Sequence, residues 1–260
     1  MKYQEFGLEK NTFERIFQNN LKKAKEYNSQ SKPSDLPWFF WCDQKFLFND
    51  LVCIGAYLQD DFDMVKFYSH DLFNACDLLF WGEWRNLPNE YAQNVNLSSQ
   101  EYALKKTPWM QPFLHCTALS FALGNISKAQ MIASYPTEEC EDLELGAKIE
   151  DRYLYLLLAQ WIATGIWNHK YEKIISDGKR KTPRMVLDVL INLRDDNQVM
   201  FEKTLQQYLS HFKKYDFSNC HFSKILSYIG TILFYLGIQK GYSITESKIL
   251  NNPYLILNLQ

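Results

Sequence analysis

The sequence has little glycine, proline or net charge, and no apolar run long enough to cross a membrane. Its 260 residues include only 10 glycines and 8 prolines, too few for the frequent tight turns of a β-sandwich. The formal net charge is -2, so the chain as a whole does not attract a phosphate backbone or an anionic membrane. These shortages favour a helix-rich globular protein, and we predict neither nucleic acid nor a membrane as its partner.

The longest apolar stretch is YLYLLLAQWIATGIW, which runs from Tyr153 to Trp167 and is interrupted only by Gln160 and Thr164. A membrane helix needs roughly 20 apolar residues, and charged residues flank this stretch on both sides. A helix that is apolar around its whole circumference must be surrounded by protein instead. We therefore predict that Tyr153 to Trp167 forms the central buried helix of the fold.

The six cysteines contain no CxxC pair and no closely spaced histidine partners, which excludes the common zinc sites and a compact disulfide framework. Several fall on apolar stripes of predicted helices, where a free thiol behaves as a small hydrophobic group. The N-terminal residues are charged throughout and lack the apolar core of a signal peptide. We expect reduced cysteines and a cytoplasmic protein. The cysteines are Cys42, Cys53, Cys76, Cys116, Cys140 and Cys220.

Motifs of catalysis are also missing. The sequence has no HExxH pair, no glycine-rich phosphate loop and no GxSxG turn, so we predict no catalytic residue, no cofactor and no metal, and not an enzyme. One acidic cluster, Asp60, Asp61 and Asp63, leaves a magnesium-dependent all-α enzyme open as an alternative. The helix macrodipole offers a simpler explanation, since carboxylates stabilise the start of a helix.

Apolar residues recur at helical spacing along most of the chain. The spacing predicts about nine or ten helices joined by short turns, in an irregular, repeat-like array of antiparallel hairpins with essentially no sheet. No fixed repeat period is present. We predict one all-α domain over residues 1–260, with a sub-boundary near residues 85–98 as the alternative. The predicted N-terminal caps of the helices are Thr12, Asp60 or Asp61, Thr182, and Asp195 or Asp196.

Two features suit contact with another protein. An acidic segment can steer a basic partner, and the long irregular segment near residue 90 carries aromatic residues of the kind that dominate binding energy. The candidate partner-binding residues are Glu138, Glu139, Glu141, Asp142 and Glu144, with Trp81, Trp84 and Tyr91. A basic run, Lys179, Arg180, Lys181 and Arg184, lacks interleaved aromatic residues and is interpreted as a solvated turn.

The C-terminal half, from about Trp109 to Leu257, resembles the immunity protein 49 family, all-helical antidotes of bacterial polymorphic toxin systems. The resemblance depends on the order of several segments. These are ALSFALGNISKAQMIASYP, the apolar helix DRYLYLLLAQWIATGIW, a helix pair containing Leu187, Leu190, Phe201 and Leu205, and the ending FYLGIQKGYSITESKILNNPYLILNLQ. Where the family ends in Tyr-Leu-Pro, this chain has Pro253, Tyr254 and Leu255, and its first hundred residues match only in general helical character.

The resemblance implies a protein that binds one cognate toxin in the cytosol and blocks it stoichiometrically, without catalytic residues. The succession of hairpins leaves a second hypothesis, a helical-repeat adaptor or scaffold that binds a host-cell peptide or protein.

Overall fold

The computed structural model describes residues 8–31, 36, 38–59, 61–83, 109–140, 148–212, 225–257 and 259. Within these ranges the chain forms eleven α-helices and a short π-helix, and no strand. The predicted all-α fold is confirmed. Contacts divide the chain into two compact units: Met1–Pro112, Glu138–Leu145 and Asp216–Ile225 form the first, and Phe113–Thr137, Gly146–Tyr215 and Leu226–Gln260 form the second. The single domain over 1–260 stays a prediction, and its suggested sub-boundary near 85–98 lies outside the described residues.

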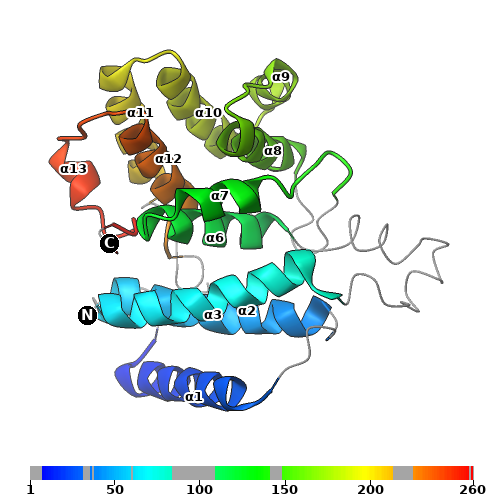
Figure 1. Cartoon of the computed structure of the whole chain (residues 1–260). Coiled ribbons are helices and arrows are strands. Elements are labelled where there is room, and N and C mark those ends of the chain that lie inside the picture. The colour runs from blue at the N-terminus through cyan, green and yellow to red at the C-terminus, as the bar shows by residue number, and fades with distance from the viewer. Residues whose placement is uncertain are drawn as a thin grey trace. The chain divides into compact units, whose positions relative to one another are not determined.

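The first unit is built on an antiparallel helical hairpin. Its helices are α1 (Lys10–Ser29), α2 (Trp38–Cys53), a π-helix (Ile54–Gln59) and α3 (Phe62–Trp81). Helices α2 and α3 lie side by side along their length (Figure 1), and Leu51, Leu72 and Leu79 are fully buried. The α3 residue Asp71 accepts a hydrogen bond from Asn28 of α1 at 2.9 Å, which ties α1 to this hairpin.

The second unit continues the hairpin pattern with shorter helices. They are α6 (Met110–Ala122), α7 (Ile126–Ala133), α8 (Ile149–Thr164), α9 (His169–Asp177), α10 (Lys181–Arg194), α11 (Gln198–Phe212), α12 (Tyr228–Gln239) and α13 (Ser247–Leu250). The part of α6 from Phe113 onward belongs to this unit, and its first three residues belong to the first unit. Helix α8 packs on α7 and α9, and α10 packs on α9 and α11 (Figure 1). Neighbouring helices in sequence are therefore neighbours in space, as the short predicted turns require.

The C-terminal segment completes the core of the second unit although it is not helical. The backbone N–H of Ser227 donates to the carbonyl of Tyr254 at 2.8 Å, and the N–H of Ile256 donates to Thr231 Oγ1 at 3.1 Å. Tyr254, Leu255 and Ile256 are all buried. The Pro-Tyr-Leu ending is thus held against the first turns of α12 by both backbone pairing and apolar packing.

The central apolar helix is only partly as predicted. The buried residues of the predicted stretch are Leu154, Leu156, Leu157, Leu158, Ala159 and Ile162, and its other residues are partly or fully exposed. Helix α8 starts at Ile149 and ends at Thr164, and a separate helix, α9, follows. Gly165 adopts a left-handed conformation with φ 71°, which ends the helix before Ile166 and Trp167. With this extra helix the described residues already exceed the predicted nine or ten.

Three of the predicted caps are wrong and one is confirmed. Helix α1 follows Glu9 and α10 follows Arg180, neither with a capping side chain, so Thr12 and Thr182 lie inside helices. The hydroxyl of Thr182 instead lies 3.3 Å from His211 Nε2. Asn197, rather than Asp195 or Asp196, accepts from the N–H of Met200, because α11 begins at Gln198 and Asp195 is the residue that ends α10. The two aspartates pair with Arg194 and Lys240. Asp61 caps α3 as predicted, accepting from Met64 at 2.9 Å.

Candidate interaction surface

The turn after α8 brings two tryptophans together at the surface of the second unit. The N–H of Gly165 donates to the carbonyl of Trp161 at 2.8 Å, and the N–H of Ile166 donates to Thr164 Oγ1 at 3.1 Å. With the chain reversed in this way, the rings of Trp161 and Trp167 meet edge to face with centroids 5.2 Å apart. A continuous helix would place residues six positions apart on different faces, so the left-handed glycine creates this contact.

Asn168 fixes the direction in which α9 leaves the turn. Its side-chain oxygen accepts from the backbone N–H groups of Lys170 and Tyr171, as an N-cap does. Its amide nitrogen donates to Gln160 Oε1 at 2.9 Å. The cap therefore joins the start of α9 to the end of α8, and Trp167 lies between these two anchors.

A shared carboxylate connects Trp167 to α9 and α10. The Oε2 atom of Glu172 accepts from Trp167 Nε1 at 2.6 Å and from Arg194 Nη1 at 3.2 Å, and His169 Nδ1 lies 3.0 Å from the same oxygen. The Arg194 guanidinium also lies over the Trp167 ring, 4.8 Å from its centroid. Asp195 completes the arrangement by accepting from Arg194 Nε and Nη2 at 2.7 and 3.2 Å. We call Trp161, Trp167, Glu172 and Arg194 the Trp167 cluster.

The Trp167 cluster is ordered by its own contacts while part of it stays open to solvent. The Arg194 side chain is 29% exposed, both tryptophans are partly exposed, and the adjoining Ile166 is 59% exposed. An arginine stacked on tryptophan contributes about 0.5–2 kcal/mol, and its bidentate pair with Asp195 fixes the guanidinium plane further. An aromatic ring and a guanidinium are thus held in one geometry at this surface by contacts within the chain.

The ionisation of Glu172 is coupled to this arrangement. Burial raises the pKa of Glu172, but the hydrogen bonds from Trp167 and His169 and the charges of Arg194 and His169 outweigh burial and leave the pKa below its ordinary value. A carboxyl whose pKa is lowered by folding stabilises the folded state above its unfolded pKa, and that contribution is lost as the pH falls.

We therefore expect Glu172→Gln to weaken the acid sensitivity of the protein. At about pH 7 the variant should be less stable than the original by about 1 kcal/mol. Below about pH 4.3, the pKa of a free glutamate, the difference should shrink as the pH falls. Urea unfolding across this range measures it. Trp167→Phe is the companion variant, since it keeps the carboxylate and removes the indole donor that lowers the Glu172 pKa, and its total loss of stability on acidification should be smaller than in the original. A difference that is constant with pH would contradict the coupling.

The residues predicted from the sequence as partner-binding lie elsewhere. Trp81 is the last residue of α3 and is 44% exposed, with its ring edge to face against Phe80 at 5.3 Å. Glu138 and Glu139 follow α7 and are exposed. Glu141, Asp142, Glu144, Trp84 and Tyr91 lie outside the described residues. Trp81, Glu138 and Glu139 fall in the first unit, whereas the Trp167 cluster belongs to the second.

The described members of the predicted acidic cluster near residue 60 lie at the start of a helix. Asp61 is a helix cap and Asp63 lies in the first turn of α3, as the macrodipole interpretation predicts, while Asp60 is outside the described residues. Over the described part of the chain, no three or more His, Cys, Asp and Glu side chains gather in a way that could hold a metal. His115 is buried, its ring 4.4 Å from that of Tyr228.

Sequence reasoning missed the Trp167 cluster because it assigned Trp167 to a buried helix. A signal was present in Gly165 to Asn168, a glycine followed three residues later by an asparagine, which is typical of one helix ending and another beginning. The partners of Trp167 come from α9 and α10, 5 and 27 positions further along the chain, as the pairs with Glu172 and Arg194 show. No local pattern links those positions.

Comparison with known proteins gives no relative from which a function could be transferred. No family model matches the chain, and no curated protein or solved structure matches it significantly. None of the helices in the described ranges has the length and apolar character required to span a bilayer.

Proposed function

We propose that this protein is an immunity protein, which binds a cognate bacterial toxin by stoichiometric protein–protein contact and so neutralises it. The proposal places the encounter in the cytosol, because Cys42, Cys53, Cys76, Cys116 and Cys140 are buried and form no disulfide, as is usual for proteins of reducing compartments. The choice of a toxin as partner comes from the resemblance of residues 109–257 to the immunity protein 49 family.

The observation that carries the binding role is the Trp167 cluster with its exposed neighbour Ile166. Tryptophan and arginine are enriched among residues that dominate binding energy, and such residues lie in rigid, well-packed patches. Here Trp167 and Arg194 are held by Glu172 and Asp195, so little side-chain freedom remains to be lost on binding. Fixing side chains in advance reduces the entropic cost of association.

Co-expression with the toxic product of a neighbouring gene tests the function. The original protein is expected to restore growth, and Trp167→Ala and Arg194→Ala should each weaken toxin binding by about 2 kcal/mol or more, roughly a 30-fold rise in Kd. Ile166→Glu is the variant least able to disturb folding, since this side chain is already exposed, and it should weaken binding by placing a charge in the contact.

Trp81→Ala compares the Trp167 cluster with the surface predicted from the sequence, which includes this exposed tryptophan of the first unit. If the toxin contacts the Trp167 cluster, Trp81→Ala should leave binding unchanged. If Trp81→Ala abolishes protection and the three variants around Trp167 do not, the contact surface is wrong. If the original protein leaves toxicity unchanged, the immunity function itself is wrong.

The succession of hairpins in the second unit keeps the adaptor hypothesis as a second candidate. An adaptor would bind a host-cell peptide or protein irrespective of any toxic neighbour, and the Trp167 cluster would serve that partner equally well. Purification of complexes from the native host separates the two functions, because only the immunity protein should retain the neighbouring gene's product.

A further inference from the structure

The apolar stretch of α8 is interrupted by two polar residues, Gln160 and Thr164. They lie four positions apart and therefore share one face of the helix. Gln160 is partly exposed and Thr164 is exposed, at the end of α8 where the chain turns toward Trp167. Leucine at either position would favour the helix at least as well, so helix formation does not account for the two polar groups.

The Thr164 hydroxyl ties the backbone of Ile166 to α8. It donates to the backbone carbonyl of Gln160 at 2.7 Å and accepts from the N–H of Ile166 at 3.1 Å. The first of these bonds is common for threonine within a helix. The second reaches past the left-handed Gly165, at which the helix ends, and so fixes the residue that precedes Trp167.

The Gln160 side chain ties Asn168 to the same helix. Gln160 Oε1 accepts from Asn168 Nδ2 at 2.9 Å, while Asn168 Oδ1 accepts from the first backbone N–H groups of α9. Aspartate would cap α9 equally well, but asparagine adds an amide donor. Gln160 is the group that accepts from this donor, so the pair serves more than the cap.

Both ties lead to Gln160 and enclose Trp167. Ile166 is joined through Thr164 to the Gln160 carbonyl, and Asn168 is joined to the Gln160 side chain. Trp167 is the single residue between Ile166 and Asn168. Its ring contacts side chains of α8, α9 and α10, so a displacement of its backbone would disturb all three contacts at once.

We propose that Gln160 and Thr164 are positioning residues of the Trp167 cluster, which hold Trp167 in the geometry in which it contacts the partner. This inference deepens the proposed function and rests on it. A side chain that is already immobile loses less freedom when a complex forms. Without the two ties the partner would have to order the turn as it bound, and the affinity would fall.

Hydrogen exchange of the Trp167 indole N–H, followed by NMR in the whole labelled protein, tests the positioning without a partner. Gln160→Met removes the hydrogen-bonding side-chain groups and keeps the length and the helix preference of the residue. The indole N–H donates to Glu172, and we expect it to exchange about threefold to tenfold faster in this variant. Thr164→Val should act in the same direction, and Thr164→Ser, which keeps the hydroxyl, should leave the exchange unchanged.

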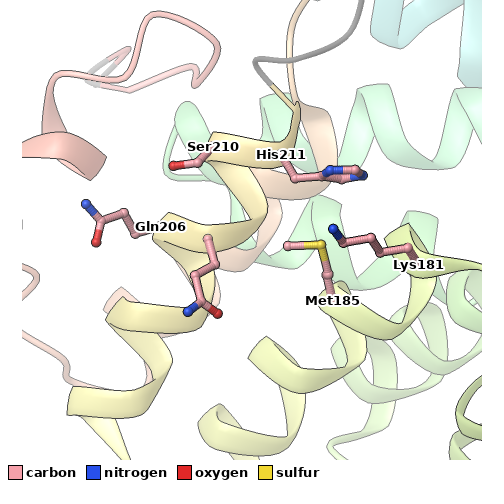
Figure 2. Close-up of a pocket in the computed structure, with 6 residues that line it drawn as sticks. Lys181, Met185, Gln206, Ser210 and His211 are labelled. Atoms are coloured by element: carbon pink, nitrogen blue, oxygen red, sulfur yellow. The ribbon is translucent and has the colours of Figure 1, made fainter.

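Gln206→Met is the matched control for Gln160→Met. Gln206 is also a partly exposed glutamine within a helix, and it lines an open hollow between α10 and α11 (Figure 2). Helix α11 contributes no residue to the Trp167 cluster. The same substitution at Gln206 should therefore leave the exchange of the Trp167 indole unchanged.

The affinity for the toxic product of the neighbouring gene tests the binding role. Gln160→Met should raise the Kd about threefold to tenfold, and Gln206→Met should not change it. In a protein that already carries Trp167→Ala, Gln160→Met should change the Kd by less than about twofold. A residue that acts through Trp167 has no effect once that side chain is removed, whereas a direct contact would persist.

Faster indole exchange, together with a rise in Kd that disappears in the Trp167→Ala protein, supports the inference. It is overturned if Gln160→Met and Gln206→Met give the same exchange or the same Kd, or if Gln160→Met raises the Kd equally with and without Trp167. Each of these results leaves the immunity function standing, because the original protein still binds the toxin. An original protein that does not bind the toxin overturns the immunity function and the binding role of Gln160 together, and the indole exchange then shows only whether Gln160 holds the turn.

Discussion

Replacement of Ile256 by alanine is expected to lower the free energy of unfolding by about 2–5 kcal/mol. Ile256 is 1% exposed, and it belongs to the non-helical C-terminal segment that packs against α12. Loss of the side chain removes buried apolar area and leaves a cavity that the surrounding helices can fill only in part. Because domains of this size are stable by only about 5–15 kcal/mol, the expected loss is a large fraction of the total.

Leu257→Ala is the matched control, since it removes a similar side chain from the adjacent, partly exposed position. Urea unfolding followed by circular dichroism should show a clearly smaller loss for Leu257→Ala. Thr231→Val addresses the backbone contact, because it removes the oxygen that accepts from the Ile256 N–H and leaves a buried donor unsatisfied, at a cost of about 1–3 kcal/mol. Equal losses for Ile256→Ala and Leu257→Ala would show that the C-terminal segment does not pack as described.

Gly237→Ala is expected to destabilise the protein, against the usual effect of that substitution in a helix. Alanine in place of a helical glycine normally gains about 0.5–1 kcal/mol. At Gly237, in α12, an added Cβ would lie 2.7 Å from Cζ and 2.8 Å from Cε1 of Phe201. Phe201 is fully buried and its ring packs edge to face on Tyr242 at 5.4 Å, so it has little room to move. Overpacking costs about 1–3 kcal/mol, so the net effect should be a loss.

Phe201→Leu tests whether this clash is the cause. In a protein that already carries Phe201→Leu, the smaller side chain leaves space for the new methyl group, and Gly237→Ala should cost less or become stabilising. A double-mutant cycle by chemical denaturation measures the interaction directly, with an expected coupling of about 1 kcal/mol or more. Additive effects of the two substitutions would mean that α12 does not approach Phe201 this closely.

Much of the fold was predictable because helix formation depends on the spacing of residues within a few positions of one another. The apolar spacing of Phe201, Leu205 and Leu209 marks the buried face of α11, and all three are buried. Asp61 was identified as a cap because a cap acts within three residues of its own position. The succession of hairpins was predictable from the short turns, because a short turn places consecutive helices side by side.

The errors arose where another group engaged a side chain or where a helix began at another residue than predicted. Thr182 had the chemistry of a cap, but its hydroxyl contacts His211, 29 positions away. Asp195 was predicted to cap α11, but that helix begins at Gln198 and Asp195 ends α10 instead. Distance in the sequence also affected the candidate surface. Trp81, predicted to bind a partner, is exposed, whereas Trp167 was assigned to the interior because nothing near it in sequence indicated Arg194.

By itself the sequence determined that this chain is all-helical, that its helices form successive hairpins, and which face of most helices is buried, because these properties depend on spacings within one or two turns. The tertiary structure alone decided that Trp167, Glu172 and Arg194 meet at one surface and that the Thr182 hydroxyl contacts His211. Those groups come from separate helices, and their distances are set by how the helices pack, which no local periodicity encodes.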